Sequence, residues 1–92
     1  MGVGLVWLLR RVESLGSIQL AAKDMGMSYA KAHRILKRLE SAAGRKFLLR
    51  RRGGHDRGGA RLTSYARRFI ARYEELESRV HAHARTAFAE IF

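Results

Sequence analysis

The sequence predicts a mainly α-helical domain in which three short helices are followed by a β-hairpin and one long C-terminal helix. Apolar residues recur at spacings of three and four in four segments, which is the period of an amphipathic helix. Glycines separate the first three segments, and the 92 residues contain no proline. A glycine-rich stretch between two short apolar runs indicates the hairpin.

The first two helices are bounded by small turn residues. The first helix ends at Gly16, and its predicted core face consists of Leu5, Leu8, Leu9, Val12 and Leu15. Ser17 is the expected N-cap of a second helix of about two turns, which ends at Gly26. Its apolar stripe consists of Ile18, Ala21, Ala22 and Met25.

A third helix is expected to start at the N-cap Ser28 and to end at Gly44. Its predicted buried face consists of Ala32, Ile35, Leu36, Leu39 and Ala43. A short helix, a turn with a glycine and a longer helix form a helix-turn-helix pattern. Any pair of antiparallel helices could show the same spacing, because periodicity reports packing and not partners.

Two short strands follow, one around Phe47–Leu49 and one around Arg61–Thr63. They enclose four glycines within residues 53–59, which predicts a hairpin, the wing of a winged helix-turn-helix. A nucleotide-binding P-loop is not expected, since the Gly-Lys-Ser/Thr ending is missing.

The stretch from Thr63 to Phe92 predicts one long helix that could reach about 45 Å. Residues 1–62 are therefore expected to form a winged helix-turn-helix DNA-binding domain, and residues 63–92 a long dimerisation helix of the same domain. The residues expected to pair with a second copy are Phe69, Tyr73, Leu76, Val80, Ala84, Ala87, Phe88 and Ile91. Alternatively, the helix packs back across its own domain, or its end is frayed.

The charge points to a polyanionic partner. Nineteen Lys and Arg residues against eight Asp and Glu give a formal net charge of +11. Residues 1–62 carry 14 of the basic and 4 of the acidic side chains, so the excess lies in the first part of the chain. The absence of cysteine excludes disulfides and thiolate zinc sites. The apolar start of the chain fits neither a signal peptide nor a membrane span, and we expect a cytoplasmic, nucleoid-associated protein.

The third helix is expected to present a basic face to double-stranded DNA. The residues predicted to contact DNA from it are Ala30, Lys31, His33, Arg34, Lys37 and Arg38. Arg34 and His33 are the candidates for base contacts. Ser28 and Tyr29 at the helix start could hold a phosphate, although Ser28 could be only a cap and Tyr29 only a core-edge aromatic.

The wing offers arginines for the minor groove, of which Arg51, Arg52 and Arg57 are the predicted contacts. The alternative is a solvated basic face. Neither a metal site nor an enzyme is expected, because His81 and His83 have the wrong spacing for a metal pair and no nucleophile lies in a pattern with a base. We expect no small-molecule substrate.

The run from Gly16 to Tyr29 and the run from Gly53 to Tyr65, with its Leu62-Thr63 step, resemble the N-terminal domain of the ModE-type molybdate-responsive transcriptional regulators. More loosely, they resemble the DNA-binding domain of LysR-type regulators. The resemblance implies a winged helix that dimerises through its long terminal helix and binds a palindromic operator. In full ModE regulators a separate C-terminal region binds molybdate, so we expect no cofactor in this chain. His33, Arg34, Lys37 and Arg38 make the recognition helix more basic, so the operator is not carried over.

The prediction is therefore a sequence-specific, homodimeric DNA-binding regulator. One alternative is a non-specific architectural protein or an RNA-binding protein, which the same charge would serve. Another is an adaptor that pairs helices and whose basic face is incidental.

Overall fold

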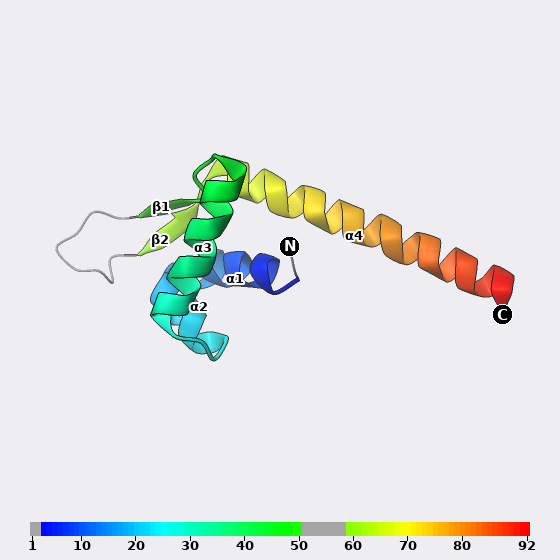
Figure 1. Ribbon diagram of the computed structural model, residues 1–92, viewed down its shortest axis with the longest axis horizontal. Helices are drawn as coiled ribbons and strands as arrows, with labels where there is room; N and C mark the ends of the chain where they lie inside the picture. Colours follow the sequence, from blue (N-terminus) through cyan, green and yellow to red (C-terminus); the bar gives the residue numbers. More distant parts are fainter. Residues whose placement is uncertain (1–2, 51–58) are drawn as a thin grey trace.

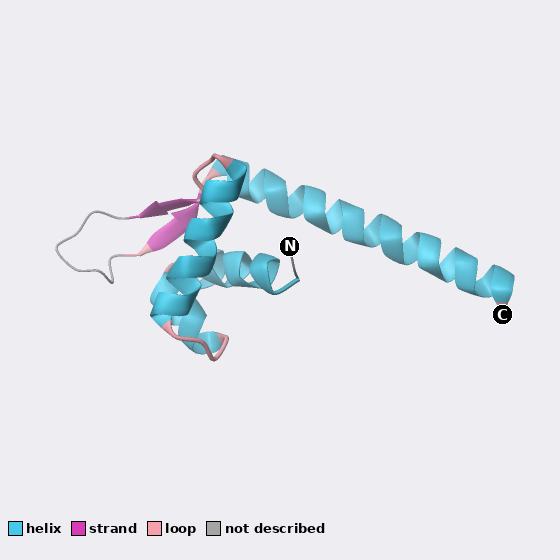
Figure 2. Ribbon diagram, in the orientation of Figure 1, coloured by secondary structure: helices cyan, strands magenta, loops and turns pink. Residues whose placement is uncertain are grey.

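The computed structural model describes residues 3–50 and 59–92, and its elements follow the predicted order (Figure 1). They are α1 (Val3–Leu15), α2 (Ile18–Asp24), α3 (Tyr29–Ala43), β1 (Leu48–Arg50), β2 (Ala60–Leu62) and α4 (Ser64–Ile91). The first three helices and the two strands form a headpiece, from which α4 projects as a rod (Figure 2). Because α4 projects in this way, the molecule is elongated, and its longest dimension is 59 Å. The prediction of a mainly α winged helix-turn-helix with a long C-terminal helix is confirmed.

Hydroxyl side chains cap the helices, at the predicted Ser17 and also at Thr63, which was not predicted as a cap. The Ser17 Oγ accepts a hydrogen bond from the Leu20 N–H at 3.1 Å. The Thr63 Oγ1 accepts one from the Ala66 N–H at 3.1 Å and donates one to the Lys46 carbonyl at 2.8 Å. Each cap satisfies a backbone donor that has no partner within the helix. Thr63 also fastens the start of α4 to the segment before β1.

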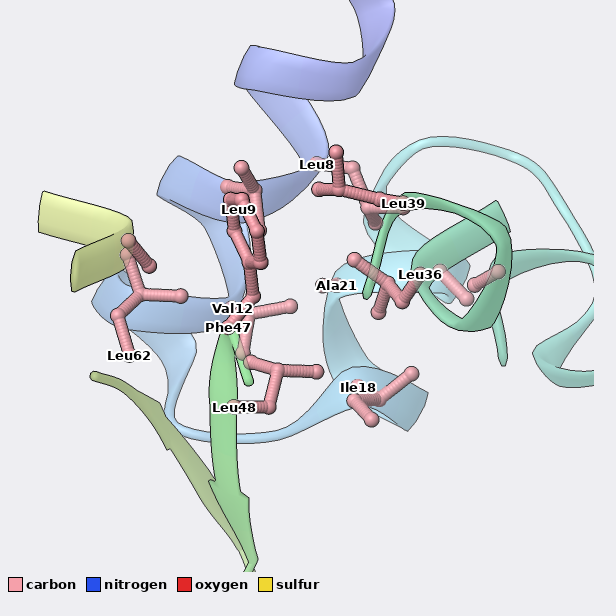
Figure 3. Close-up of a cluster of buried hydrophobic side chains, with 13 residues drawn as sticks. Leu8, Leu9, Val12, Ile18, Ala21, Leu36, Leu39, Phe47, Leu48 and Leu62 are labelled. Atoms are coloured by element: carbon pink, nitrogen blue, oxygen red, sulfur yellow. The ribbon is translucent and has the colours of Figure 1, made fainter. Parts of the chain in front are cut away.

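One hydrophobic core joins all the headpiece elements (Figure 3). Its largest fully buried side chains are Phe47, Leu8, Leu9, Leu36, Leu62, Val6 and Val12. The ring of Phe47 meets the rings of Tyr65 and Phe69 edge-on, with both centroid distances 5.3 Å. These aromatic contacts hold the first turns of α4 against the core.

Two predicted core positions are wrong. Leu15 is 41% exposed and Ala43 is also exposed, whereas Val6, which was not assigned to the core, is buried. Leu15 and Ala43 lie in the last turns of α1 and α3, beyond the last residue of each stripe that another element covers. Periodicity continues to the end of a helix even where the packing stops.

The wing hairpin is antiparallel, with Leu48 opposite Leu62 and Arg50 opposite Ala60. The Ala60 N–H donates to the Gly16 carbonyl at 2.9 Å, which joins the hairpin to the turn between α1 and α2. Gly59, with a φ of 101°, permits this approach, because a Cβ there would lie 3.2 Å from the Gly16 oxygen.

Two ion pairs connect the near end of α4 to α1. The Arg67 guanidinium donates to both carboxylate oxygens of Glu13 at 3.0 and 3.1 Å, and Arg10 pairs with Glu74. The hydrogen bonds to Glu13 and the negative charge of the same carboxylate raise the pKa of the Arg67 guanidinium above its ordinary value. Beyond these contacts α4 leaves the headpiece (Figure 1), so the alternative in which the helix packs back along its whole length is wrong. No helix in the described ranges is both long and apolar enough to span a membrane.

Candidate nucleic-acid interface

The outward face of α3 is a basic surface opposite the core. Ala32, Leu36 and Leu39 are buried on the inner side. The predicted contacts Ala30, Lys31, Arg34, Lys37 and Arg38 are all exposed, and His33 is half-buried. Arg34 and Lys37 therefore point away from the core, as predicted. DNA contact by these residues stays a prediction.

The start of α3 combines a cap with an exposed aromatic ring. The Ser28 Oγ accepts a hydrogen bond from the Lys31 N–H at 3.0 Å, so the N-cap assignment is confirmed, and its phosphate role stays a prediction. Tyr29 is 41% exposed, and its ring centroid lies 5.8 Å from that of His33. The interpretation of Tyr29 as a core-edge aromatic is therefore wrong.

The environment of His33 disfavours its charged form. Burial is the main cause that lowers the pKa of this imidazole, followed by the positive charges of Arg50 and Lys37, while Glu40 acts in the opposite direction. The lowered pKa favours the neutral form of this imidazole. Cations from two elements, Arg50 at the end of β1 and Lys37 on α3, therefore both act on this imidazole.

Glu40, an acid on this basic face, was not singled out from the sequence. Its Oε2 accepts hydrogen bonds from the Phe47 N–H at 2.8 Å and from the Leu48 N–H at 3.2 Å. The carboxylate thereby holds the first residues of the wing against α3. A single glutamate in a helix forms no pattern from which this role could be predicted.

A basic hollow at the end of α3 was also missed. It has a volume of about 280 Å³ and is lined by Lys37, Glu40, Ser41, Gly44, Arg45 and Lys46. The Arg45 guanidinium carbon lies 5.2 Å from the centre of the Tyr65 ring, which holds this cation in place. Arg45 and Lys46, the two basic residues after Gly44, contribute to the net charge, and the sequence predicted no specific role for them.

The described part of the wing adds exposed cations at Arg50 and Arg61. Together with Gly16, Leu49, Gly59 and Ala60 they line a second hollow of about 470 Å³. The predicted contacts Arg51, Arg52 and Arg57 lie outside the described residues.

The predicted dimerisation residues divide into two groups along α4. Phe69 and Tyr73 are half-buried, and Phe69 packs against Phe47 of its own chain. Further along, Ala87 is half-buried, and the remaining predicted residues Leu76, Val80, Ala84, Phe88 and Ile91 are exposed. Apart from the Phe92 ring, whose centroid lies 4.8 Å from that of Phe88, nothing in the described residues covers these exposed apolar side chains.

Metal coordination has no visible basis in residues 3–50 and 59–92. No group of three or more His, Cys, Asp or Glu side chains is placed there to hold a metal ion.

The sequence of this chain matches known regulators. A family model described as "Bacterial regulatory helix-turn-helix protein, lysR family" matches residues 5–67, from α1 to the first turn of α4. The transcriptional regulator ModE of Haemophilus influenzae is 39% identical over 79 residues, which are 86% of this chain and 31% of the relative. The molybdenum transport protein ModE of Azotobacter vinelandii is 39% identical over 70 residues, which are 76% of this chain and 26% of the relative. The chain thus spans about a third or less of the length of these relatives.

Solved structures show the same fold. The DNA-binding domain of CbnR in a complex with DNA has a TM-score of 0.68 at 26% identity, covering 95% of this chain and 98% of that one. Full-length CbnR complexed with its target DNA has a TM-score of 0.68 at 25% identity, covering 92% of this chain and 29% of that one. Both resemblances found in the sequence, to ModE-type and to LysR-type regulators, are confirmed.

Proposed function

The chain belongs to the lysR family of bacterial regulatory helix-turn-helix proteins, and we propose that it reads double-stranded DNA sequence-specifically as a homodimer. In this proposal it is the DNA-reading part of a ModE-like transcription regulator. The observation that carries the proposal is the exposed basic face of α3, on which Arg34 and Lys37 are exposed while Leu36 and Leu39 are buried against the core.

The recognition step follows from this geometry. A helix that enters the major groove needs slim side chains near its start and hydrogen-bonding cations further along. On α3, Ala30 is the slim residue and Arg34 is the cation one turn later. We assign Arg34 to a guanine edge, because arginine can donate two hydrogen bonds to its O6 and N7 atoms.

Phosphate contacts would surround the base contact. Lys37, Arg45 and Lys46 line the hollow at the end of α3, and Arg50 stands at the end of β1. Cations at both sites would fix the position of the helix on the duplex without reading sequence. We propose Arg51, Arg52 and Arg57 as minor-groove contacts, because arginine suits the negative potential of that groove.

Dimerisation would use the exposed stripe of α4. Its apolar side chains Leu76, Val80, Phe88 and Ile91 are 58–74% exposed. A monomer would leave this apolar surface in contact with water, whereas a dimer would bury it. Glu74 pairs with Arg10 and Glu75 with Arg79 in the same chain. The exposed apolar side chains, and not these charges, therefore support the proposed interface. A two-fold dimer would present two α3 helices about 34 Å apart, one turn of DNA.

Effector binding is not assigned to this chain. We propose that it carries no cofactor and no catalytic site and that any molybdate binding belongs to a separate domain. We place its action in the cytoplasm, where the DNA of bacteria is found.

The test is an anisotropy titration with a duplex selected from a random pool, compared with a scrambled duplex of the same composition. We expect the selected duplex to bind at least about 10³-fold more tightly, and its affinity to fall roughly 10³-fold or more between 50 and 200 mM salt. Arg34→Ala should reduce the preference, whereas Arg68→Ala, an exposed arginine on α4, should preserve it. A preference near one for the wild type would instead indicate an architectural protein.

A further inference from the structure

We propose that Tyr29 and His33 form an aromatic step that contacts the C5 methyl group of a thymine in the major groove, next to the base read by Arg34. This inference rests on the proposed function and adds a second base contact to it. The observation that carries it is the paired and partly exposed arrangement of the two rings at the start of α3.

The two rings form a continuous surface. Tyr29 is the first residue of α3 and His33 follows it by four positions, so both side chains lie on one side of the helix. Their centroids are 5.8 Å apart and their planes differ by 32°. The Tyr29 ring is 41% exposed. Its exposed face is available to an incoming ligand.

The chemistry of this surface favours an apolar group over a phosphate. The charged groups around His33 are Arg50, Lys37 and Glu40, and burial with the two cations lowers the pKa of the imidazole. The neutral form of the ring is therefore favoured, and it carries no positive charge to attract a phosphate. A neutral aromatic pair offers an apolar face, and the thymine methyl is the apolar feature of the major groove edge.

The position on the helix brings this surface to the bases. Residues near the N-terminus of a recognition helix reach base edges, and Tyr29 and His33 lie in the first two turns of α3. The row formed by Ala30 and Arg34 lies one residue further around the helix. The methyl group of Ala30 leaves room for a base edge between the aromatic step and the guanidinium. A guanine and a thymine at neighbouring positions would then be read together.

The experiment removes only the methyl group. Each thymine of the duplex selected by the wild-type chain is replaced in turn by uracil, which pairs identically but lacks the C5 methyl. Dissociation constants are measured for the wild type, for Tyr29→Ser, for His33→Asn and for Trp7→Ser. Trp7 on α1 serves as the control, because it is an aromatic side chain of comparable exposure, 50% against 41% for Tyr29.

At one thymine in each half-site, we expect uracil to weaken wild-type binding about fourfold, the effect of one buried methyl group. Tyr29→Ser and His33→Asn should abolish this difference between thymine and uracil, and Trp7→Ser should retain it. The proposal is overturned if no uracil substitution weakens wild-type binding, or if the difference survives both α3 variants. In either case the preference for the selected duplex would still support the proposed function, whereas loss of that preference itself would contradict it.

Discussion

Glu40 connects α3, which carries the candidate DNA-binding surface, to the first residues of the wing. Its Oε2 accepts the N–H groups of Phe47 and Leu48 at 2.8 and 3.2 Å, at the point where the chain turns from α3 into the wing. Glu40→Ala removes the acceptor and leaves both donors, which are partly buried, without a protein partner. Glu40→Gln keeps an oxygen acceptor and removes only the charge.

The magnitude follows from these two bonds. A hydrogen bond to a charged group contributes about 1.5–3 kcal/mol, and water can replace part of that at a site that is only partly buried. We therefore expect Glu40→Ala to lower the free energy of unfolding by about 2–3 kcal/mol and Glu40→Gln by about 1 kcal/mol. For a domain of this size, the first value corresponds to a decrease of about 2 M in the urea midpoint.

The assay is urea unfolding followed by circular dichroism, with Ser41→Ala as the control. Ser41 is the exposed neighbour of Glu40 on α3, and its substitution should change stability by no more than about 0.5 kcal/mol. DNA affinity of the Glu40→Ala variant is measured below its unfolding transition, and it should fall because the wing is no longer held beside α3. The reasoning is refuted if Glu40→Ala is as stable as Ser41→Ala.

Three further predictions concern the dimer, pH and the wing. Phe88→Glu alters a side chain that is 64% exposed in the single chain, so the fold should persist while sedimentation velocity shows monomers; an unchanged sedimentation coefficient would refute the assigned interface. Because the pKa of His33 is lowered below 6.5, its contribution to stability is complete above that pH and decreases as the pH falls toward the folded-state pKa; His33→Gln should therefore flatten the fall in urea midpoint on acidification, and identical pH profiles would contradict this. Gly59→Ala should destabilise the domain by roughly 1–3 kcal/mol, since φ is 101° and the new Cβ would lie 3.2 Å from the Gly16 oxygen. Thermal unfolding measures this loss, and an unchanged midpoint would show that the turn does not need glycine.

Local signals in the sequence were sufficient to predict the helices. Ser17 and Ser28 stand where a hydroxyl is needed to cap a helix, and Gly16 and Gly44 stand where the chain adopts positive φ angles of 72° and 67°. These are effects of neighbouring residues within one or two turns. The outward face of α3 could also be predicted, because the position of the core follows from the helical period.

Contacts between distant segments could not be predicted in the same way. The Arg67–Glu13 pair joins residues 54 positions apart, and Arg10 pairs with Glu74 on another helix. Many arginines and glutamates in the chain could form such pairs, and only the arrangement of α1 and α4, which both pack against β2, selects these. The exposure of Leu15 has the same origin, since the end of a neighbouring element decides where an apolar stripe stops being covered.

The claim that the basic face of α3 lies in the major groove is tested most directly by methylation interference on the selected duplex. Dimethyl sulfate places a methyl group on guanine N7, an atom at the floor of the major groove. We predict that methylated guanines interfere with binding in two half-sites about ten base pairs apart. In the Arg34→Ala variant, methylation of one of these guanines in each half-site should no longer interfere. Wild-type binding that keeps its sequence preference while tolerating a methyl group at every guanine of the half-sites would contradict this placement of α3.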